Sequence, residues 1–244
     1  MRITEELYLV GSGQYGLSHP FDCSVYLVDC GTELALIDAG AGVIIDPIVE
    51  NVRREGLDPT HLRTVIVTHA HADHSGGAQA FREQYGCEIY APQGDIRLIE
   101  AGTDEEMGLH IATRSGFYTS DYVYPHSKVD KGVSDGDQIT VGRVTFSAIQ
   151  VPGHSEHSIC LLWEKGDTKI LFSADVVFFE GRIGLLNYPG SSLAAYRRNI
   201  QKLSDLAVDM LFPGHGIFVL KDGQRHIDLA IDALSRLQIP SNFI

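Results

Sequence analysis

The sequence predicts a mixed fold of helices and strands, in which sheets pack together and are flanked by helices. Its 244 residues are enough for one large hydrophobic core or two small ones, and one domain of this size is common among layered proteins of helices and strands. Strand-like runs come first in each half of the chain and then alternate with helix-like runs. No solenoid-type repeat, low-complexity segment or linker interrupts the pattern. Residues 1–244 are therefore predicted to form a single domain.

The first half begins with strands and continues with helices between further strands. Runs rich in strand formers are bounded by glycine or polar turns. Asp46-Pro47 fits a helix start, with an acid at the N-cap and proline at the first helical position. The predicted strands are 8–10, 24–29, 34–38, 64–67 and 88–90, and the predicted helices begin at 46 and cover 76–84.

Residues 93–125 have a weaker pattern and are predicted to be an insertion over this scaffold. Residues 100–113 fit a helix, but the stretch that holds Tyr118, Tyr122 and Tyr124 has no clear period. Two interpretations stay open: an ordinary surface excursion, and a lid or dimer contact that shapes a pocket. Under the second interpretation the insertion sets specificity and supports a homo-oligomer.

The second half returns to strands before its helices. Ser191 or Ser192 is predicted to cap a helix whose apolar residues recur at spacings of three and four. These apolar residues are Leu193, Tyr196, Ile200 and Leu203. The predicted strands are 138–141, 144–151, 158–163, 168–173 and 209–212, with a hairpin around 165–167 and a last helix from about 223 to 237.

Charge and hydropathy exclude several classes of partner. The formal net charge is −13, and no run of Lys or Arg is visible, which argues against a nucleic-acid partner. No apolar run approaches the ~20 residues that cross a bilayer, and acids stand where a signal peptide is basic. We expect a cytoplasmic protein without a membrane partner. The four cysteines lack C-x-x-C spacing and are predicted to be buried free thiols.

The segment THAHADHSGG, residues 68–77, concentrates metal-ligand chemistry at a strand end. His69 and His71 are two residues apart and point the same way if the chain stays extended, and a turn can aim Asp73 and His74 at a second point nearby. Neutral imidazole and carboxylate groups suit zinc, iron or manganese. The alternative, a solvated loop rich in histidine, fits any one of these residues better than all four.

Three further donors each follow a strand-like run. His154 and His215 end two Pro-Gly-His sequences, and Asp175 follows the predicted strand 168–173. Strands in register would deliver these groups to one edge of the sheets, and Pro-Gly turns permit the sharp change of direction. The seven donors exceed the three protein ligands of a catalytic tetrahedral site and suit two metals that share a carboxylate.

The order His-x-His-x-Asp-His, Gly-His, Asp and Gly-His resembles the metallo-β-lactamase superfamily, from about Leu34 to His215. The resemblance implies an α+β fold, the αββα four-layer sandwich, with two divalent metals, most commonly zinc, on one edge between the sheets; iron and manganese stay open. It assigns His69, His71 and His154 to the first metal, Asp73, His74 and His215 to the second, and Asp175 to both. Asp38, in an Asp-x-Gly sequence, would orient a ligand imidazole, although a plain turn acid fits too.

The resemblance, close to glyoxalase II, implies a binuclear metal-dependent hydrolase of small molecules. A metal-bridging hydroxide would attack a small thioester, lactone or related ester, and Asp73 would pass on its proton. Asn187 and Tyr188, on a loop after the bridging acid, are weak candidates for substrate contact. A tyrosine hydroxyl bonded to backbone is an equal interpretation of Tyr188.

The chain departs from several branches of the family. Asp175 replaces the Cys ligand of one lactamase branch, and Val176 stands near where quorum-sensing lactonases carry a tyrosine. Only 29 residues follow His215, so the extra helical domain of glyoxalase II is not expected. His157 takes the place of a common glycine, either as a turn residue or in the pocket.

Two other functions remain open from the sequence. One is a persulfide dioxygenase-like enzyme with a single iron, and the other is a non-catalytic metal-binding protein. The substrate, the metal in the cell and the oligomeric state do not follow from the sequence.

Overall fold

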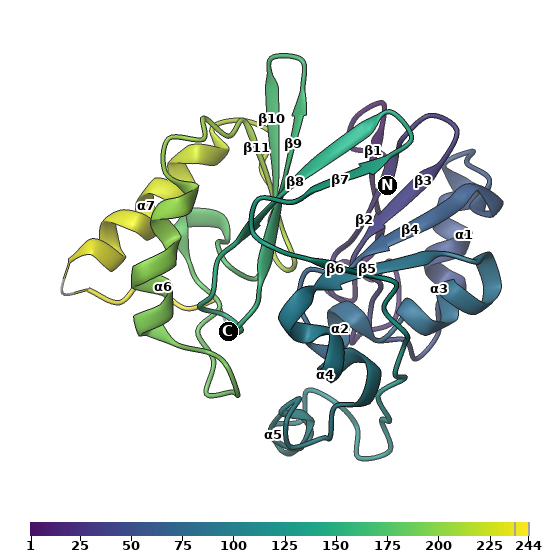
Figure 1. Cartoon of the computed structure of the whole chain (residues 1–244), viewed down its shortest axis with the longest axis horizontal. Coiled ribbons are helices and arrows are strands. Elements are labelled where there is room, and N and C mark those ends of the chain that lie inside the picture. The colour runs from purple at the N-terminus through teal and green to yellow at the C-terminus, as the bar shows by residue number, and fades with distance from the viewer. Residues whose placement is uncertain (237, 244) are drawn as a thin grey trace. The chain divides into compact units, whose positions relative to one another are not determined.

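The computed structural model describes residues 1–236 and 238–243. The chain forms two compact units, each built on one sheet (Figure 1). The first contains residues 1–133 and 141–144, and the second contains residues 134–140 and 145–244. That the two act as a single domain stays a prediction.

The first unit is built on a six-stranded sheet in the order β1-β2-β3-β4-β5-β6. β1 to β3 pair antiparallel, and β3 to β6 pair parallel. β6 is a short strand that the sequence did not predict. The strands are β1 (Leu7–Gly11), β2 (Val25–Asp29), β3 (Leu34–Ile37), β4 (Leu62–Ile66), β5 (Glu88–Pro92) and β6 (Lys131–Val133).

Helices connect the parallel strands, as the geometry of a parallel crossover requires. α1 (Asp46–Arg54) joins β3 to β4, and α3 (Ala78–Tyr85) joins β4 to β5, with both helices beside the sheet (Figure 1). The helix begins at Asp46-Pro47 as predicted, but Ile45 is its N-cap, so the predicted N-cap role of Asp46 is wrong and the acid lies in the first helical turn. The apolar face of α1 packs in one buried cluster with Leu27 and Leu36 of the sheet. Its burial is the main force that holds the helix in place. The one-turn helix α2 (Ala72–Ser75) and the 3-10 turn η1 (Pro59–His61) complete this region.

The insertion contains two short helices after the 3-10 turn η2 (Gln93–Asp95). The prediction of one helix over residues 100–113 is wrong, because α4 (Ile96–Ala101) ends before α5 (Leu109–Arg114) begins. Gly102 leaves α4 with an extended backbone, and Gly108 precedes α5 at a φ of 68°. Glycine adopts that left-handed conformation without the steric penalty of a side chain.

The second unit is built on a five-stranded sheet in the order β11-β10-β9-β8-β7. β8, β9 and β10 pair antiparallel, and β10 pairs parallel with β11. The predicted hairpin is confirmed by the pairing of Thr168 with Lys165, across a turn in which Gly166 has a φ of 58°. The strands are β7 (Gln138–Val141), β8 (Val144–Gln150), β9 (Ile159–Lys165), β10 (Thr168–Ala174) and β11 (Met210–Pro213).

Helices α6 (Leu193–Asn199) and α7 (Gly223–Ser235) lie beside this sheet (Figure 1). The predicted apolar face is buried except at the half-buried Leu193, and its last turn is the 3-10 helix η4 (Ile200–Leu203) rather than α-helix. Tyr196 and Ile227 pack with Leu171 of β10 in one apolar cluster. The predicted last residue of α7, Leu237, lies outside the described residues. A further 3-10 turn, η3 (Phe179–Gly181), precedes α6.

Among the described residues, no helix combines the length and the apolar character that crossing a membrane requires. The structure has all four cysteines as buried free thiols.

Candidate metal centre

The HxHxDH segment leaves the sheet at the end of β4 and turns at once into α2. His71 stands at the N-cap of this single helical turn, which carries Asp73 and His74. Asp73, His74 and His69 are buried, and His71 is half-buried. The first unit thus brings together all four donors that the sequence predicted there.

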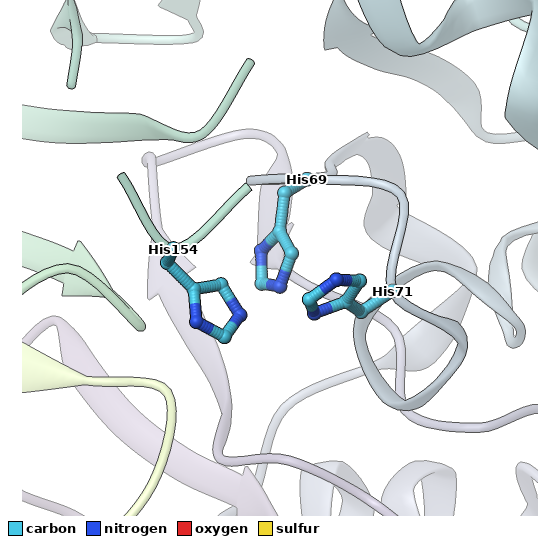
Figure 2. A group of neighbouring side chains, drawn as sticks. All are labelled: His69, His71 and His154. Atoms are coloured by element: carbon cyan, nitrogen blue, oxygen red, sulfur yellow. The ribbon is translucent and has the colours of Figure 1, made fainter. Parts of the chain in front are cut away.

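The imidazoles of this segment converge. Figure 2 shows the rings of His69 and His71 turned toward one another, with ring centres 4.5 Å apart. The ring centres of His69 and His74 are 4.1 Å apart. Figure 2 also labels His154, which belongs to the second unit and is described with it below. Three aromatic nitrogen bases in such close contact form a donor cluster typical of metal sites.

Asp38, at the end of β3, orients two of these imidazoles. Its Oδ2 lies 2.8 Å from Nδ1 of His74 and accepts from the Thr68 hydroxyl at 3.0 Å, while its Oδ1 accepts from the Thr68 backbone N–H at 2.8 Å. Thr68 Oγ1 lies 3.0 Å from Nδ1 of His69. Because the hydroxyl proton goes to the carboxylate, Nδ1 of His69 donates to Thr68. One carboxylate therefore holds a proton on Nδ1 of both rings, so that Nε2 carries the lone pair.

Two glycines let the HxHxDH segment lie directly on the loop that carries Asp38. A Cβ on Gly77 would lie 2.0 Å from the carbonyl oxygen of Ala39, and one on Gly76 would lie 2.3 Å from that of Ala41. Such distances are impossible for a side chain, which explains the Gly-Gly pair after His74. The backbone N–H of Ala39 donates to the carbonyl of His74 at 2.8 Å and fixes the approach.

Asp95 anchors the same segment from the other side. Its buried carboxylate accepts a hydrogen bond from the backbone N–H of Ala70, between the two histidines, at 3.0 Å. Neither Asp95 nor Thr68 was predicted as a site residue from the sequence. Thr68 was open to detection as a hydroxyl next to the motif, whereas nothing local marks Asp95, which lies 25 residues away.

Cys23 lies beside His74 and Asp38, with donor atoms of the three residues within 4.8 Å of one another. Burial raises the pKa of its thiol far above the usual range, and the nearby imidazole of His74 opposes this only in part. The thiolate is the form that binds metal. Burial thus favours the protonated thiol, and Nδ1 of the neighbouring His74 is already hydrogen-bonded to Asp38.

The second unit gathers the three remaining donors around Asp175. Oδ2 of Asp175 lies 3.5 Å from Nε2 of His154 and 3.5 Å from Nε2 of His215. Asp175 directly follows β10, and the backbone N–H of Gly214 donates to the carbonyl of Ala174 at 2.8 Å, which ties the two strand ends together. Asp175 and His154 are buried, and His215 is mostly buried.

A backbone carbonyl sets the tautomer of His154. Its Nδ1 lies 2.6 Å from the carbonyl oxygen of Gly184, and because a carbonyl only accepts, Nδ1 carries the proton. A Cβ on Gly184 would lie 2.7 Å from that same Nδ1, so a residue with a side chain would push the ring away. The sequence analysis missed this contact, because a carbonyl leaves no mark on the residue type.

This donor set fits divalent metal ions. In His69, His74 and His154 the Nδ1–H group donates a hydrogen bond to a protein acceptor, which is how metal-binding histidines are usually oriented. Donors about 2.0–2.1 Å from a tetrahedral ion are roughly 3.3 Å apart, close to the separations around Asp175. The carboxylate oxygen of Asp175 faces the Nε2 lone pair of His154, and a cation between the two removes the repulsion.

On the loop after β10, Asn187 is exposed and Tyr188 is half-buried, with the Tyr188 carbonyl accepting from the N–H of Ser191 at 3.1 Å. His157 is half-buried, with Nδ1 3.4 Å from the amide nitrogen of Gln150. Substrate contact by Asn187 and Tyr188 stays a prediction.

Comparison with known proteins gives the family. The model of the metallo-beta-lactamase superfamily matches residues 19–215. Acyl-coenzyme A thioesterase MBLAC2 of Gallus gallus is 28% identical over 252 residues, which cover 94% of this chain and 86% of that protein. A hydroxyacylglutathione hydrolase of Rhizobium johnstonii is 30% identical over 160 residues, which cover 66% of this chain and 49% of that protein.

The fold agrees with solved structures. BJP-1, a subclass B3 metallo-beta-lactamase of Bradyrhizobium japonicum, matches with a TM-score of 0.73 at 22% identity, over 96% of this chain and 90% of that one. The predicted α+β fold of the metallo-β-lactamase type is therefore confirmed. The chain belongs to the metallo-β-lactamase superfamily, in which it is similar to hydrolases, one of them named a thioesterase.

Proposed function

We propose that this protein is a binuclear metal-dependent hydrolase that acts on a small thioester, lactone or related ester. The observation that carries the proposal is the position of Asp175, with one carboxylate oxygen equidistant from Nε2 of His154 and of His215. A carboxylate between two imidazoles assigned to different metals suits a bridging ligand. The similarity to an acyl-coenzyme A thioesterase supports a thioester as the first bond to test.

The family order of donors gives the ligand assignment. His69, His71 and His154 would hold the first metal, and Asp73, His74 and His215 would hold the second, with Asp175 shared. Zinc is the metal we propose, and these donors also suit iron and manganese. When bound, the ions supply a water whose pKa falls toward ~7 and a Lewis acid for the substrate carbonyl.

The chain's own residues prepare and complete the reaction. Asp38 keeps the Nδ1 protons of His69 and His74 in place, so that both rings offer Nε2. Asp73 is buried beside His74, with Oδ2 3.5 Å from Nε2 of that ring. We assign to Asp73 the removal of a proton from the attacking water and its delivery to the leaving thiolate or alkoxide.

Metal analysis tests the proposal directly. The protein is purified without added metal, beside His215→Ala and beside His61→Ala, whose exposed histidine lies on η1. We expect two equivalents per chain in the wild type and in His61→Ala, and about one in His215→Ala. One equivalent of iron, unchanged in His215→Ala, would refute the binuclear hydrolase and favour a persulfide dioxygenase-like enzyme.

Hydrolysis assays follow with the wild-type protein. Acyl-coenzyme A thioesters, lactones and simple esters are compared before chelation, after chelation and after zinc is restored. We expect thioester hydrolysis that chelation abolishes and zinc restores. Two bound metals without activity on any of the three substrate classes would contradict the enzymatic assignment and favour a metal-binding protein.

A further inference from the structure

Three tyrosines of the insertion bind the loops that carry the metal ligands. The hydroxyl of Tyr118 donates to Oδ1 of Asp73 at 3.3 Å. The hydroxyl of Tyr122 donates to the carbonyl of Ala41 at 2.8 Å, and the hydroxyl of Tyr124 lies 2.7 Å from Oγ of Ser75. We call these residues the tyrosine clamp. Of these three hydrogen bonds, the one from Tyr118 reaches the side chain of a predicted ligand.

The ring of Tyr118 is fixed before its hydroxyl reaches Asp73. It stacks on Tyr122, with ring centres 4.5 Å apart and planes 15° apart, and it meets the edge of Phe21 at 5.3 Å. Tyr118 also packs with Ala72 of α2 in a small apolar cluster and is only 4% exposed. A ring held on several sides keeps its hydroxyl in one place at little cost in conformational entropy.

The two oxygens of Asp73 have different surroundings. Oδ1 accepts from Tyr118, because a carboxylate can only accept and the phenol must donate. Oδ2 lies 3.5 Å from Nε2 of His74, the nitrogen opposite the one that Asp38 holds. A hydrogen bond on Oδ1 thus fixes the rotation of the carboxylate and directs Oδ2 to the His74 side.

We propose that Tyr118 is a positioning residue for Asp73, and that the insertion serves the metal site by holding this carboxylate. The inference rests on the proposed function, because it assigns Asp73 to the second metal. Because the contacts of Tyr118 are buried, the inference favours an insertion that supports the site permanently over one that opens and closes as a mobile lid. Groups that hydrogen-bond to metal-ligating residues typically change metal affinity by 10–100-fold.

Tyr118→Phe tests this idea, and Tyr122→Phe is the matched control. Each variant removes one hydroxyl from the same ring stack, but the control loses a bond to a backbone carbonyl. Zinc binding to the metal-depleted protein is measured by competition with a chromophoric chelator. We expect the second equivalent to bind 10–100-fold more weakly in Tyr118→Phe, and within about twofold of wild type in the control.

The affinity of the first equivalent, in the same titration, reports whether each variant is folded. A double variant, Asp73→Asn with Tyr118→Phe, should bind zinc as Asp73→Asn alone does, because Tyr118 acts through Asp73. Visible spectra of the cobalt(II)-substituted proteins should change in Tyr118→Phe and not in the control.

The outcomes separate the two proposals. Two equivalents in the wild type, with equal affinities in Tyr118→Phe and Tyr122→Phe, would overturn the positioning role and leave the binuclear site intact. An additive loss in the double variant would overturn it as well. A single equivalent in the wild type would instead contradict the proposed function, and with it this inference.

Discussion

Asp38→Asn is the substitution that tests most directly how the imidazoles are oriented. Asp38 is 2% exposed and accepts three hydrogen bonds, two from Thr68 and one from His74. Its backbone has a φ of 62°, a conformation that asparagine tolerates better than other residues with a side chain. The variant therefore changes the acceptor without adding backbone strain.

The amide changes the tautomer of His74. The asparagine oxygen can keep the bond to the Thr68 backbone, which leaves the NH2 group facing Nδ1 of His74. Nδ1 must then accept, so the proton moves to Nε2, the nitrogen needed for metal. The two bonds to Oδ2, from Thr68 and from His74, are each worth ~1.5–3 kcal/mol as bonds to a charged group, and the new bonds of the amide recover part of that combined loss. We expect a net destabilisation of about 1.5–3 kcal/mol with a 10–100-fold loss of metal affinity.

Two measurements separate these effects. Thermal unfolding of the metal-free protein should show a midpoint lower by roughly 3–12 °C, from the usual sensitivity of a chain of this size. Chelator competition should show the loss of metal affinity. Asp22→Asn is the control, because Asp22 is also buried but accepts from the backbone of Ala41 at 2.8 Å and of His19 at 3.0 Å.

Asp22→Asn should lose stability and keep metal affinity within about twofold. If Asp38→Asn binds metal as tightly as the wild type, then Asp38 does not set the tautomer of His74. If Asp22→Asn loses as much metal affinity as Asp38→Asn, the effect belongs to the packing of the unit and not to the carboxylate–imidazole contact.

Three further predictions concern residues of the second unit. Gly184→Ala should weaken metal binding at least ~10-fold in chelator competition, because the new Cβ would lie 2.7 Å from Nδ1 of His154; unchanged affinity would contradict the role of the Gly184 carbonyl. His226 accepts a hydrogen bond from the backbone N–H of Glu180 at 3.0 Å, and burial lowers the pKa of its imidazole below the usual 6.5. The stabilising effect of neutral His226 is therefore present above about pH 6.5 and is lost as the pH falls through the lowered pKa. His226→Gln keeps an acceptor without titrating, so urea unfolding at pH 5.5 and 7.5 should show a smaller pH dependence than in the wild type, and an equal dependence would show that His226 is not responsible. Ser192→Ala removes the side-chain cap of α6 and should lower the free energy of unfolding by about 1 kcal/mol in urea, whereas no change would mean that the cap is not formed in solution.

Structural features that depend on a few adjacent residues were predictable from the sequence. The start of α1 at Asp46 follows from the acid and proline alone, and the hairpin at Gly166 follows from its turn residues. The donors were recognisable because imidazole and carboxylate groups recur just after strands. In each case the signal and the structure lie within a few residues of one another.

Features that depend on distant contacts were not predictable. β6 has three residues, too few for a periodic pattern, and exists because it pairs with β5. The break between α4 and α5 depends on Gly102 and Gly108, and an isolated glycine is compatible with a helix. Tyr118 lies 45 residues from Asp73, in a stretch without period, so its role appears only when the chain is folded.

Backbone strain marks the two strand ends from which the central carboxylates extend. Asp38 follows β3 at a φ of 62°, and Ala174, directly before Asp175, ends β10 at a φ of 47°. Left-handed backbone costs roughly 1–2 kcal/mol for a residue with a Cβ, and alanine has no polar side chain to offset it. The hydrogen bond from Gly214 to the Ala174 carbonyl and the three bonds to Asp38 hold these conformations in place. Strain of this kind persists only where the surrounding structure enforces it. At both strand ends the contacts that hold the left-handed backbone also fix the point from which the carboxylate extends.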